Sequence, residues 1–123
     1  MPTTTTTQIG TALEGRAADF LQAKGLTLLG RQIRVHRGEI DLLMADQDAI
    51  VFVEVRYRRH TKLGDGAETV DWTKRARLKR AAATLLAQRP ELAAKPCRFD
   101  VISGHGPAES PHWTWYRDAF SLQ

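Results

Sequence analysis

Two segments of the chain carry apolar residues at the spacing of an amphipathic helix. The first covers residues 8–24 and is followed by Gly25, which is a typical residue at the end of a helix. The second covers residues 70–88. The positions expected to face the core are Leu13, Ala17, Phe20 and Leu21 in the first segment, and Leu78, Ala82, Leu85 and Leu86 in the second.

Other segments are rich in β-branched, aliphatic and aromatic residues and predict strands. The order is helix, three strands, helix, two strands, which is typical of a small α/β domain with helices packed on a mixed sheet. Proline residues 90 and 96 bracket a connection for which we expect no regular structure. The expected strands are residues 26–35, 39–45, 49–58, 97–103 and 112–118.

The second and third strands, "GEIDLLMADQDAIVFVEVRYR", contain carboxylates among apolar residues. A turn centred on residues 47–48 places Asp41 opposite Glu54 and Glu39 opposite Arg56. The second pair is expected to be a structural ion pair. The first pair brings two like charges together, which destabilises a sheet unless something compensates.

A divalent cation shared by Asp41 and Glu54 would compensate, and oxygen ligands favour Mg²⁺ or Mn²⁺. The alternatives are that one carboxyl is protonated or that both face water. Glu14 lies at the edge of the apolar face of the first helix, and Lys74 lies on the core-side stripe of the second. Acids and bases that converge on one sheet edge favour a centre that cleaves phosphodiester bonds.

Composition limits the class of protein. The chain has 123 residues, of which 42% are hydrophobic and 26% charged, as expected for one globular domain. We expect residues 1–8 to be a disordered lead-in and residues 9–123 to form the domain. The sequence contains no apolar run of membrane-spanning length and no secretion signal, so we expect a cytoplasmic protein. A single Cys97 excludes an internal disulfide and a cysteine-rich zinc site.

Positive charge is concentrated in one part of the chain. The net charge is +4, and nine of the 18 lysine and arginine residues lie between residues 56 and 80, against three acids. Such a cluster predicts a polyanionic partner, most simply nucleic acid; the alternative is a solvated surface. The nine residues are Arg56, Arg58, Arg59, Lys62, Lys74, Arg75, Arg77, Lys79 and Arg80.

The motifs "GEIDLL…FVEVRYR", "V…K..RL" from Val70 to Leu78, and "RFDVI" resemble the YraN-type family of predicted endonucleases over about residues 8–103. That family is similar to Holliday-junction resolvases and to the wider restriction-endonuclease-like group. The resemblance implies an αβββαβ core with a mixed central sheet, and DNA cleavage that depends on Mg²⁺ or Mn²⁺.

The resemblance also implies roles for individual residues. Asp41, Glu54 and Glu14 match the acids that hold the metal, and Arg56 stands where the family motif has lysine. An arginine stays charged, so Arg56 can orient a nucleophile and stabilise negative charge but is a poor base. The glycine that usually precedes the first acid follows it here. The residues expected to contact nucleic acid are Arg58, Arg59, Lys74, Arg75, Arg77 and Arg80.

Two other functions remain open. A nucleic-acid-binding module of the same fold that no longer hydrolyses DNA would show the same motifs. A protein-interaction adaptor would instead use the strand that carries Trp113 and Trp115, whose side chains share one face. For these tryptophans we expect packing at a sheet edge, with a homodimer surface or base stacking as alternatives.

Overall fold

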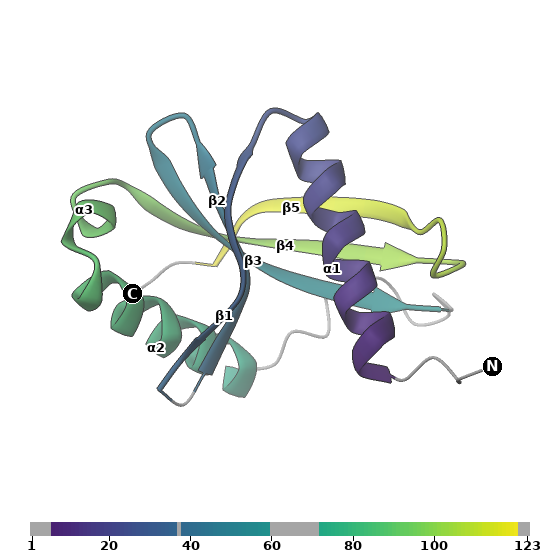
Figure 1. Ribbon diagram of the computed structural model, residues 1–123, viewed down its shortest axis with the longest axis horizontal. Coiled ribbons are helices and arrows are strands. Elements are labelled where there is room, and N and C mark those ends of the chain that lie inside the picture. Colours follow the sequence, from purple (N-terminus) through teal and green to yellow (C-terminus); the bar gives the residue numbers. More distant parts are fainter. Residues whose placement is uncertain (1–5, 37, 60–71, 121–123) are drawn as a thin grey trace.

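The computed structural model describes residues 6–36, 38–59 and 72–120. Helices and strands follow one another in the order that the sequence predicts, with one short helix added (Figure 1). They are α1 (Thr6–Ala23), β1 (Thr27–Val35), β2 (Gly38–Asp46), β3 (Ala49–Arg58), α2 (Trp72–Gln88), α3 (Pro90–Ala93), β4 (Cys97–His105) and β5 (His112–Phe120).

The five strands form one mixed sheet in the order β1-β2-β3-β4-β5. β3 and β4 run parallel because α2 and α3 carry the chain back between them, and the other neighbours are antiparallel. A parallel pair needs such a crossover, whereas antiparallel neighbours need only a turn. This confirms the predicted α/β class with a mixed sheet.

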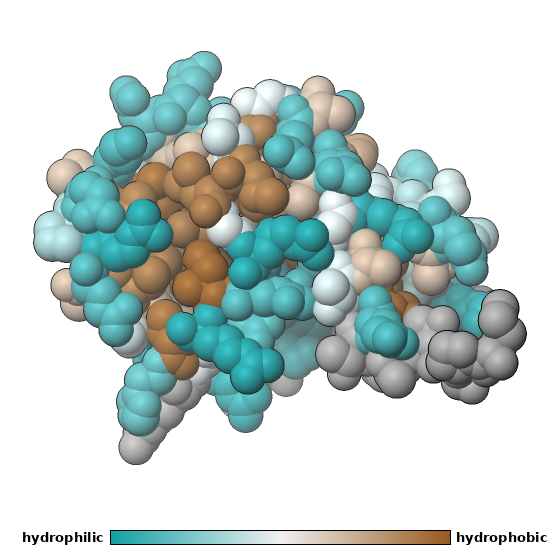
Figure 2. Space-filling view, in the orientation of Figure 1, coloured by the Kyte–Doolittle hydropathy of each residue, from teal (hydrophilic) through white to brown (hydrophobic). Residues whose placement is uncertain are grey.

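Helices cover both faces of the sheet (Figure 1). On one face α1 packs through Ala17 and Leu21 against residues of β2, β3 and β4. On the other face α2 and α3 pack through Leu78, Leu85 and Leu92. Figure 2 shows hydrophobic side chains gathered beside α1 and hydrophilic ones over much of the remaining surface in that view.

The structure corrects several predicted boundaries. Helix α1 begins at Thr6, so residues 6–8 of the expected lead-in belong to it, while residues 1–5 lie outside the described part of the chain. The connection after α2 contains α3, a single turn that begins at Pro90. Proline suits this position because the first turn of a helix does not use its backbone N–H. The expected start of the second helix at residue 70 also falls outside the described residues.

β2 and β3 pair over only part of their length and then diverge. The predicted register of β2 and β3 is confirmed from Asp46↔Ala49 to Leu42↔Val53, and there their pairing ends. Beyond this point β2 continues beside β1 as far as Gly38↔Val35. β3 continues beside β4, as far as Arg58↔His105. We call the opening between the diverging halves of β2 and β3 the fork.

A polar network joins β4 and β5 at one edge of the sheet. The carboxylate of Asp100 is fully buried and accepts hydrogen bonds from Arg98, from Trp115 Nε1 at 2.9 Å and from the Asp118 backbone N–H at 2.9 Å. Trp113 and Trp115 pack partly buried against the α1 side of the core, as expected for an edge strand. Within the described chain no helix has the length and apolar character needed to cross a membrane.

Candidate functional site

Asp41 lies where β2 separates from β3. Its Oδ2 accepts a hydrogen bond from the backbone N–H of Val55 at 2.9 Å. The backbone pairing of β2 with β3 ends at Leu42, the residue next to Asp41, and this side-chain hydrogen bond continues the contact between the two strands. Asp41 therefore links β2 to β3 at the point where their backbone pairing ends.

A cavity of about 410 Å³ opens at the fork on the side of α2. It brings two acids predicted from the sequence, Asp41 and Glu54, together with two predicted basic residues of α2, Lys74 and Arg77. The helix supplies both bases because residues three apart lie on one face. The lining residues are Gly38, Glu39, Asp41, Glu54, Lys74, Arg77 and Leu78.

A cluster of three carboxylates lies on the β2 side of the fork. One oxygen from each of Glu14, Glu39 and Asp41 lies within 4.8 Å of the others. Glu14 reaches the cluster from α1, where it lines an adjoining cavity of about 280 Å³, and Glu39 lines both cavities. Sequence reasoning assigned Glu39 only to an ion pair, although its place two residues before Asp41 on one face of β2 was a signal for this role.

The acids at the fork hold their protons more tightly than isolated carboxyls. Burial, and then the nearby charge of Asp41, raises the pKa of Glu14 to about 7. The same two causes, in the same order, raise the pKa of Glu54 to about 7. Burial also raises the pKa of Asp41, against the opposing effect of its bond from Val55. Burial first, and then the nearness of the acids to one another, therefore favours the protonated forms of Glu14 and Glu54.

Arg56 lies beside Glu54 in the partly buried part of the fork. Its Nε is 3.5 Å from Glu54 Oε1, and its side chain is 12% exposed. Nε and Nη2 are buried without a hydrogen-bond partner among the described residues. The expected ion pair of Arg56 with Glu39 is wrong: Glu39 pairs with Arg34 at 3.6 Å, because β1 and not β3 runs beside this part of β2.

The other predicted nucleic-acid contacts are divided between different surfaces. Arg75 and Lys79 lie over the ring of Phe120, at 5.3 and 5.9 Å from its centroid, and do not line the fork cavity. Arg80 is exposed, and Arg58 is partly buried at the end of β3. The described residues of the basic cluster therefore do not form one continuous patch around the acids, and Lys62 lies outside the described part of the chain.

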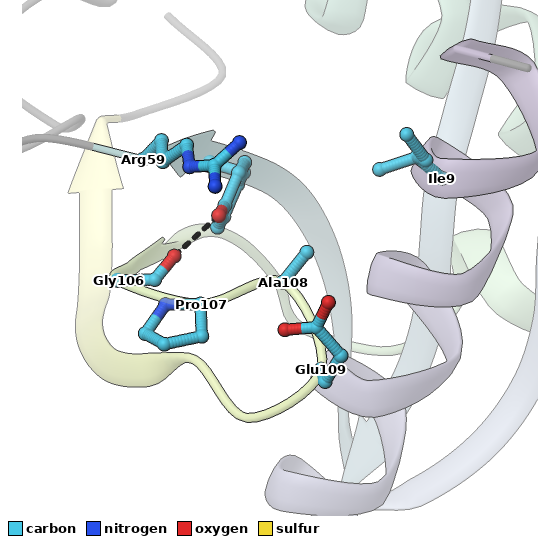
Figure 3. A pocket seen from close by; sticks show the side chains of 7 residues that line it. Ile9, Arg59, Gly106, Pro107, Ala108 and Glu109 are labelled. Atoms are coloured by element: carbon cyan, nitrogen blue, oxygen red, sulfur yellow. Dashed lines mark hydrogen bonds between the residues drawn. The ribbon is translucent and has the colours of Figure 1, made fainter. Parts of the chain in front are cut away.

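Arg59 belongs to a separate cavity of about 520 Å³ between α1, the end of β3 and the β4–β5 turn (Figure 3). There the hydroxyl of Tyr57 donates a hydrogen bond to the carbonyl of Gly106. Ile9 and the 107–109 segment also line it, and Glu109 supplies the one carboxylate among the described lining residues. This cavity is larger than the fork cavity, but its described lining residues do not include a group of acids that would hold a cation.

The donor set at the fork fits a hard divalent cation. Among the residues that the structure describes, it consists of carboxylate oxygens without histidine or cysteine, which suits Mg²⁺ or Mn²⁺ better than zinc. Oε1 of Glu14 is buried and has no hydrogen-bond partner among the described residues. A cation here would satisfy that oxygen and offset the mutual repulsion of the acids.

Comparison with known proteins places the chain among bacterial relatives of similar length. A UPF0102 protein of Xanthomonas euvesicatoria pv. vesicatoria is 49% identical over 113 residues, which cover 92% of this chain and 91% of the relative. A UPF0102 protein of Pseudomonas savastanoi pv. phaseolicola is 45% identical over 121 residues, which cover 98% of each chain. The family model described as "Uncharacterised protein family UPF0102" matches residues 13–103. The chain therefore belongs to the UPF0102 family.

Proposed function

We propose that this protein is a nuclease that cleaves phosphodiester bonds of DNA with the help of Mg²⁺ or Mn²⁺. The observation that carries the proposal is the fork cavity, where Asp41 and Glu54 lie beside Lys74 and Arg77. Carboxylates bind a hard cation, and cationic side chains bind the phosphates next to it. Burial raises the pKa values of Glu14 and Glu54 to about 7, and perturbed carboxyls that line a cavity are typical of functional sites.

The resemblance to YraN-type predicted endonucleases supports the same proposal. The order α1, β1 to β3, α2, β4 agrees with the αβββαβ core of the restriction-endonuclease-like group. Asp41, Glu54 and Glu14, together with Glu39, would hold the cation. When bound, it would supply Lewis acidity toward a phosphate oxygen and neutralise the charge of the cluster.

The protein's own residues have distinct tasks in this proposal. Lys74 and Arg77 hold phosphates of the DNA backbone at the cavity, and Arg56 offers buried N–H groups to the negative charge that develops on the reacting phosphate. Water attacks phosphorus, the bond from phosphorus to the leaving oxygen breaks, and that oxygen takes up a proton from solvent. The proton of the attacking water goes to a carboxylate, because an arginine cannot accept it.

A second candidate function is nucleic-acid binding without cleavage. It is favoured by Arg56, which lies 3.5 Å from Glu54 and permanently neutralises part of the charge that would otherwise attract a cation. In this alternative Lys74 and Arg77 still bind phosphates, and the acids have only a structural role.

Cleavage assays separate the two functions. Linear, flapped and four-way DNAs are incubated with the protein and Mn²⁺ or Mg²⁺. We expect cleavage by the wild type, a loss on the order of 10²-fold in Arg56→Ala, and substantial activity in Arg56→Lys. Asp41→Asn should bind DNA but not cleave it, whereas Asp19→Asn, an exposed acid of α1, should behave as wild type.

Two results would count against the nuclease. If the wild type binds these DNAs and cleaves none of them with either cation, the binding module is the correct reading. If Asp41→Asn cleaves as fast as the wild type, the fork is not the active site.

A further inference from the structure

Gln32 has a left-handed backbone conformation, with φ of 50°, in the middle of β1. Two other non-glycine residues of the described chain also have positive φ, and the path of the chain explains both. Gln47 lies in the two-residue turn between β2 and β3, where such turns require positive φ. Asp118 lies where the pairing of β5 with β4 shifts its register at a bulge.

The path of the chain does not explain Gln32. Its neighbours Arg31 and Ile33 pair with Leu42 and Ile40, so the register of β1 against β2 is the same on both sides. No residue is inserted or lost at this point, and the pairs on either side put Gln32 level with Asp41. Backbone strain that the fold does not require is typical of functional sites.

The unusual conformation directs the Gln32 side chain toward α1. Consecutive side chains of a strand normally point to opposite faces. Here Arg31 Nη2 donates a hydrogen bond to the Thr11 carbonyl at 2.8 Å, and Gln32 Nε2 donates one to Thr11 Oγ1 at 3.0 Å. Both residues thus reach the same residue of α1. Thr11 is three residues before Glu14, so the two share one face of the helix.

The Gln32 side chain also lies beside the acid cluster. Gln32, Glu14 and Glu39 line the same cavity. The same Glu14 carboxyl has one oxygen within 4.8 Å of oxygens of Glu39 and Asp41. Gln32 is therefore bonded to Thr11 of the helix that supplies Glu14, and it lines the same cavity as Glu14 and Glu39.

We propose that Gln32 is a positioning residue of the cation site, which uses its left-handed backbone to hold the Glu14 carboxylate toward Glu39 and Asp41. The inference rests on the cation site of the proposed function and concerns its geometry, not DNA cleavage. It predicts that removing the Gln32 amide weakens cation binding although the backbone conformation and the fold are kept.

The test compares the same substitution at two left-handed positions. Gln32→Gly and Gln47→Gly both give the backbone a residue that adopts positive φ without strain. Mn²⁺ binding to the intact protein is measured by calorimetry, and thermal unfolding verifies the fold. We expect the Mn²⁺ affinity to fall about 10-fold or more in Gln32→Gly, as is typical when a partner of a metal ligand is lost. Gln47→Gly should bind as the wild type does.

A third variant tests whether weaker binding by Gln32→Gly comes from the lost amide and not from a folding defect. Gln32→Asn keeps an amide, and asparagine tolerates the left-handed conformation. It should bind Mn²⁺ more tightly than Gln32→Gly. Equal Mn²⁺ affinities of the wild type, Gln32→Gly and Gln32→Asn would overturn the inference, as would a Gln32→Asn variant no better than Gln32→Gly.

The outcomes distinguish this inference from the proposed function. If Mn²⁺ binds, Gln32→Gly weakens it and DNA is not cleaved, the positioning role stands and the nuclease fails. If DNA is cleaved with Mn²⁺ and Gln32→Gly changes neither affinity nor rate, the nuclease stands and the positioning role fails. A wild type that binds no Mn²⁺ would overturn both.

Discussion

Several carboxyl groups lie close together at the fork, and their negative charges repel one another. Glu14 and Glu54 have pKa values of about 7, and burial raises the pKa of Asp41 as well. A hydrogen bond between the Glu54 and Asp41 carboxyls contributes to the raised pKa of Glu54, and it requires that one of the two keep a proton. When no cation is bound, protons on the carboxyls reduce the repulsion between them.

Stability should therefore depend on pH through Glu54. Its pKa is about 7 in the folded protein, against an ordinary value of 4.5, so the folded state keeps a proton that the unfolded state releases between these values. The free energy of unfolding then falls as pH rises from about 4.5 to 7, and this contribution is constant above 7. Glu54→Gln, which cannot lose a proton, should be more stable than wild type at pH 8 by on the order of 1–3 kcal/mol.

Urea unfolding at pH 8 and pH 4.5 without divalent cations measures this difference, which should nearly vanish at the lower pH. Asp19→Asn on the exposed side of α1 is the control and should change little at either pH. A Glu54→Gln variant that is less stable than wild type at pH 8 would contradict the assignment.

At the scale of helices and strands, β4 depends on a glycine. A Cβ atom at Gly104 would lie 2.6 Å from Cζ3 of Trp113 on β5, which is too close for the ring to stay in place. Gly104→Ala should therefore lower the free energy of unfolding by about 1–3 kcal/mol, the cost typical of overpacking. Chemical denaturation measures it.

Gly10 is the matched control. It lies within α1, and a Cβ there would meet nothing within 4 Å. Gly10→Ala should raise the free energy of unfolding by about 0.5–1 kcal/mol, because alanine favours the helix. Equal effects of the two substitutions would show that the contact with Trp113 is not what makes Gly104 necessary.

The elements were largely predictable from the sequence because their signals are local. Alternation and aliphatic content located β3 at residues 49–58, and helical spacing placed the ends of α1 within two residues. The fork was not predictable, because the point where two strands separate depends on how distant elements pack. The expected pair of Glu39 with Arg56 was wrong for this reason: it extended the pairing of β2 and β3 beyond Leu42.

The candidate site shows the same limit. Asp41, Glu54 and Glu14 could be selected because a carboxylate in an apolar strand or stripe stands out. Gln32 could not, since a glutamine within a strand-like segment carries no signal for positive φ. Its conformation is visible only once β1, β2 and α1 are assembled.

For the whole molecule, the fold distributes the positive charge unevenly. Lys74 and Arg77 line the fork cavity, whereas Arg75 and Lys79 lie over Phe120. The exposed side of α2 that carries Arg77 and Arg80 is therefore the surface that we expect to follow the DNA backbone.

Salt dependence of DNA binding tests that surface. If Arg77 and Arg80 each contact one phosphate, their replacement by alanine should weaken binding to all sequences alike. It should also flatten the slope of log affinity against log salt by roughly two. The control removes the same charge from two exposed residues elsewhere, Lys24→Ala with Lys95→Ala, and should leave the slope nearly unchanged. Equal slopes for all three proteins would show that this side of α2 is only a solvated surface.

The hydrogen bond from Val55 to Asp41 has a consequence for the evolution of such chains. An apolar residue at this position would leave the Val55 N–H without its acceptor in a partly buried place and loosen the joint between the two arms of the sheet. A lineage that had stopped cutting DNA would thus remain under selection to keep aspartate or asparagine there. An acid retained at this position in a distant relative is therefore evidence of common architecture, and enzymatic activity has to be inferred from the other acids.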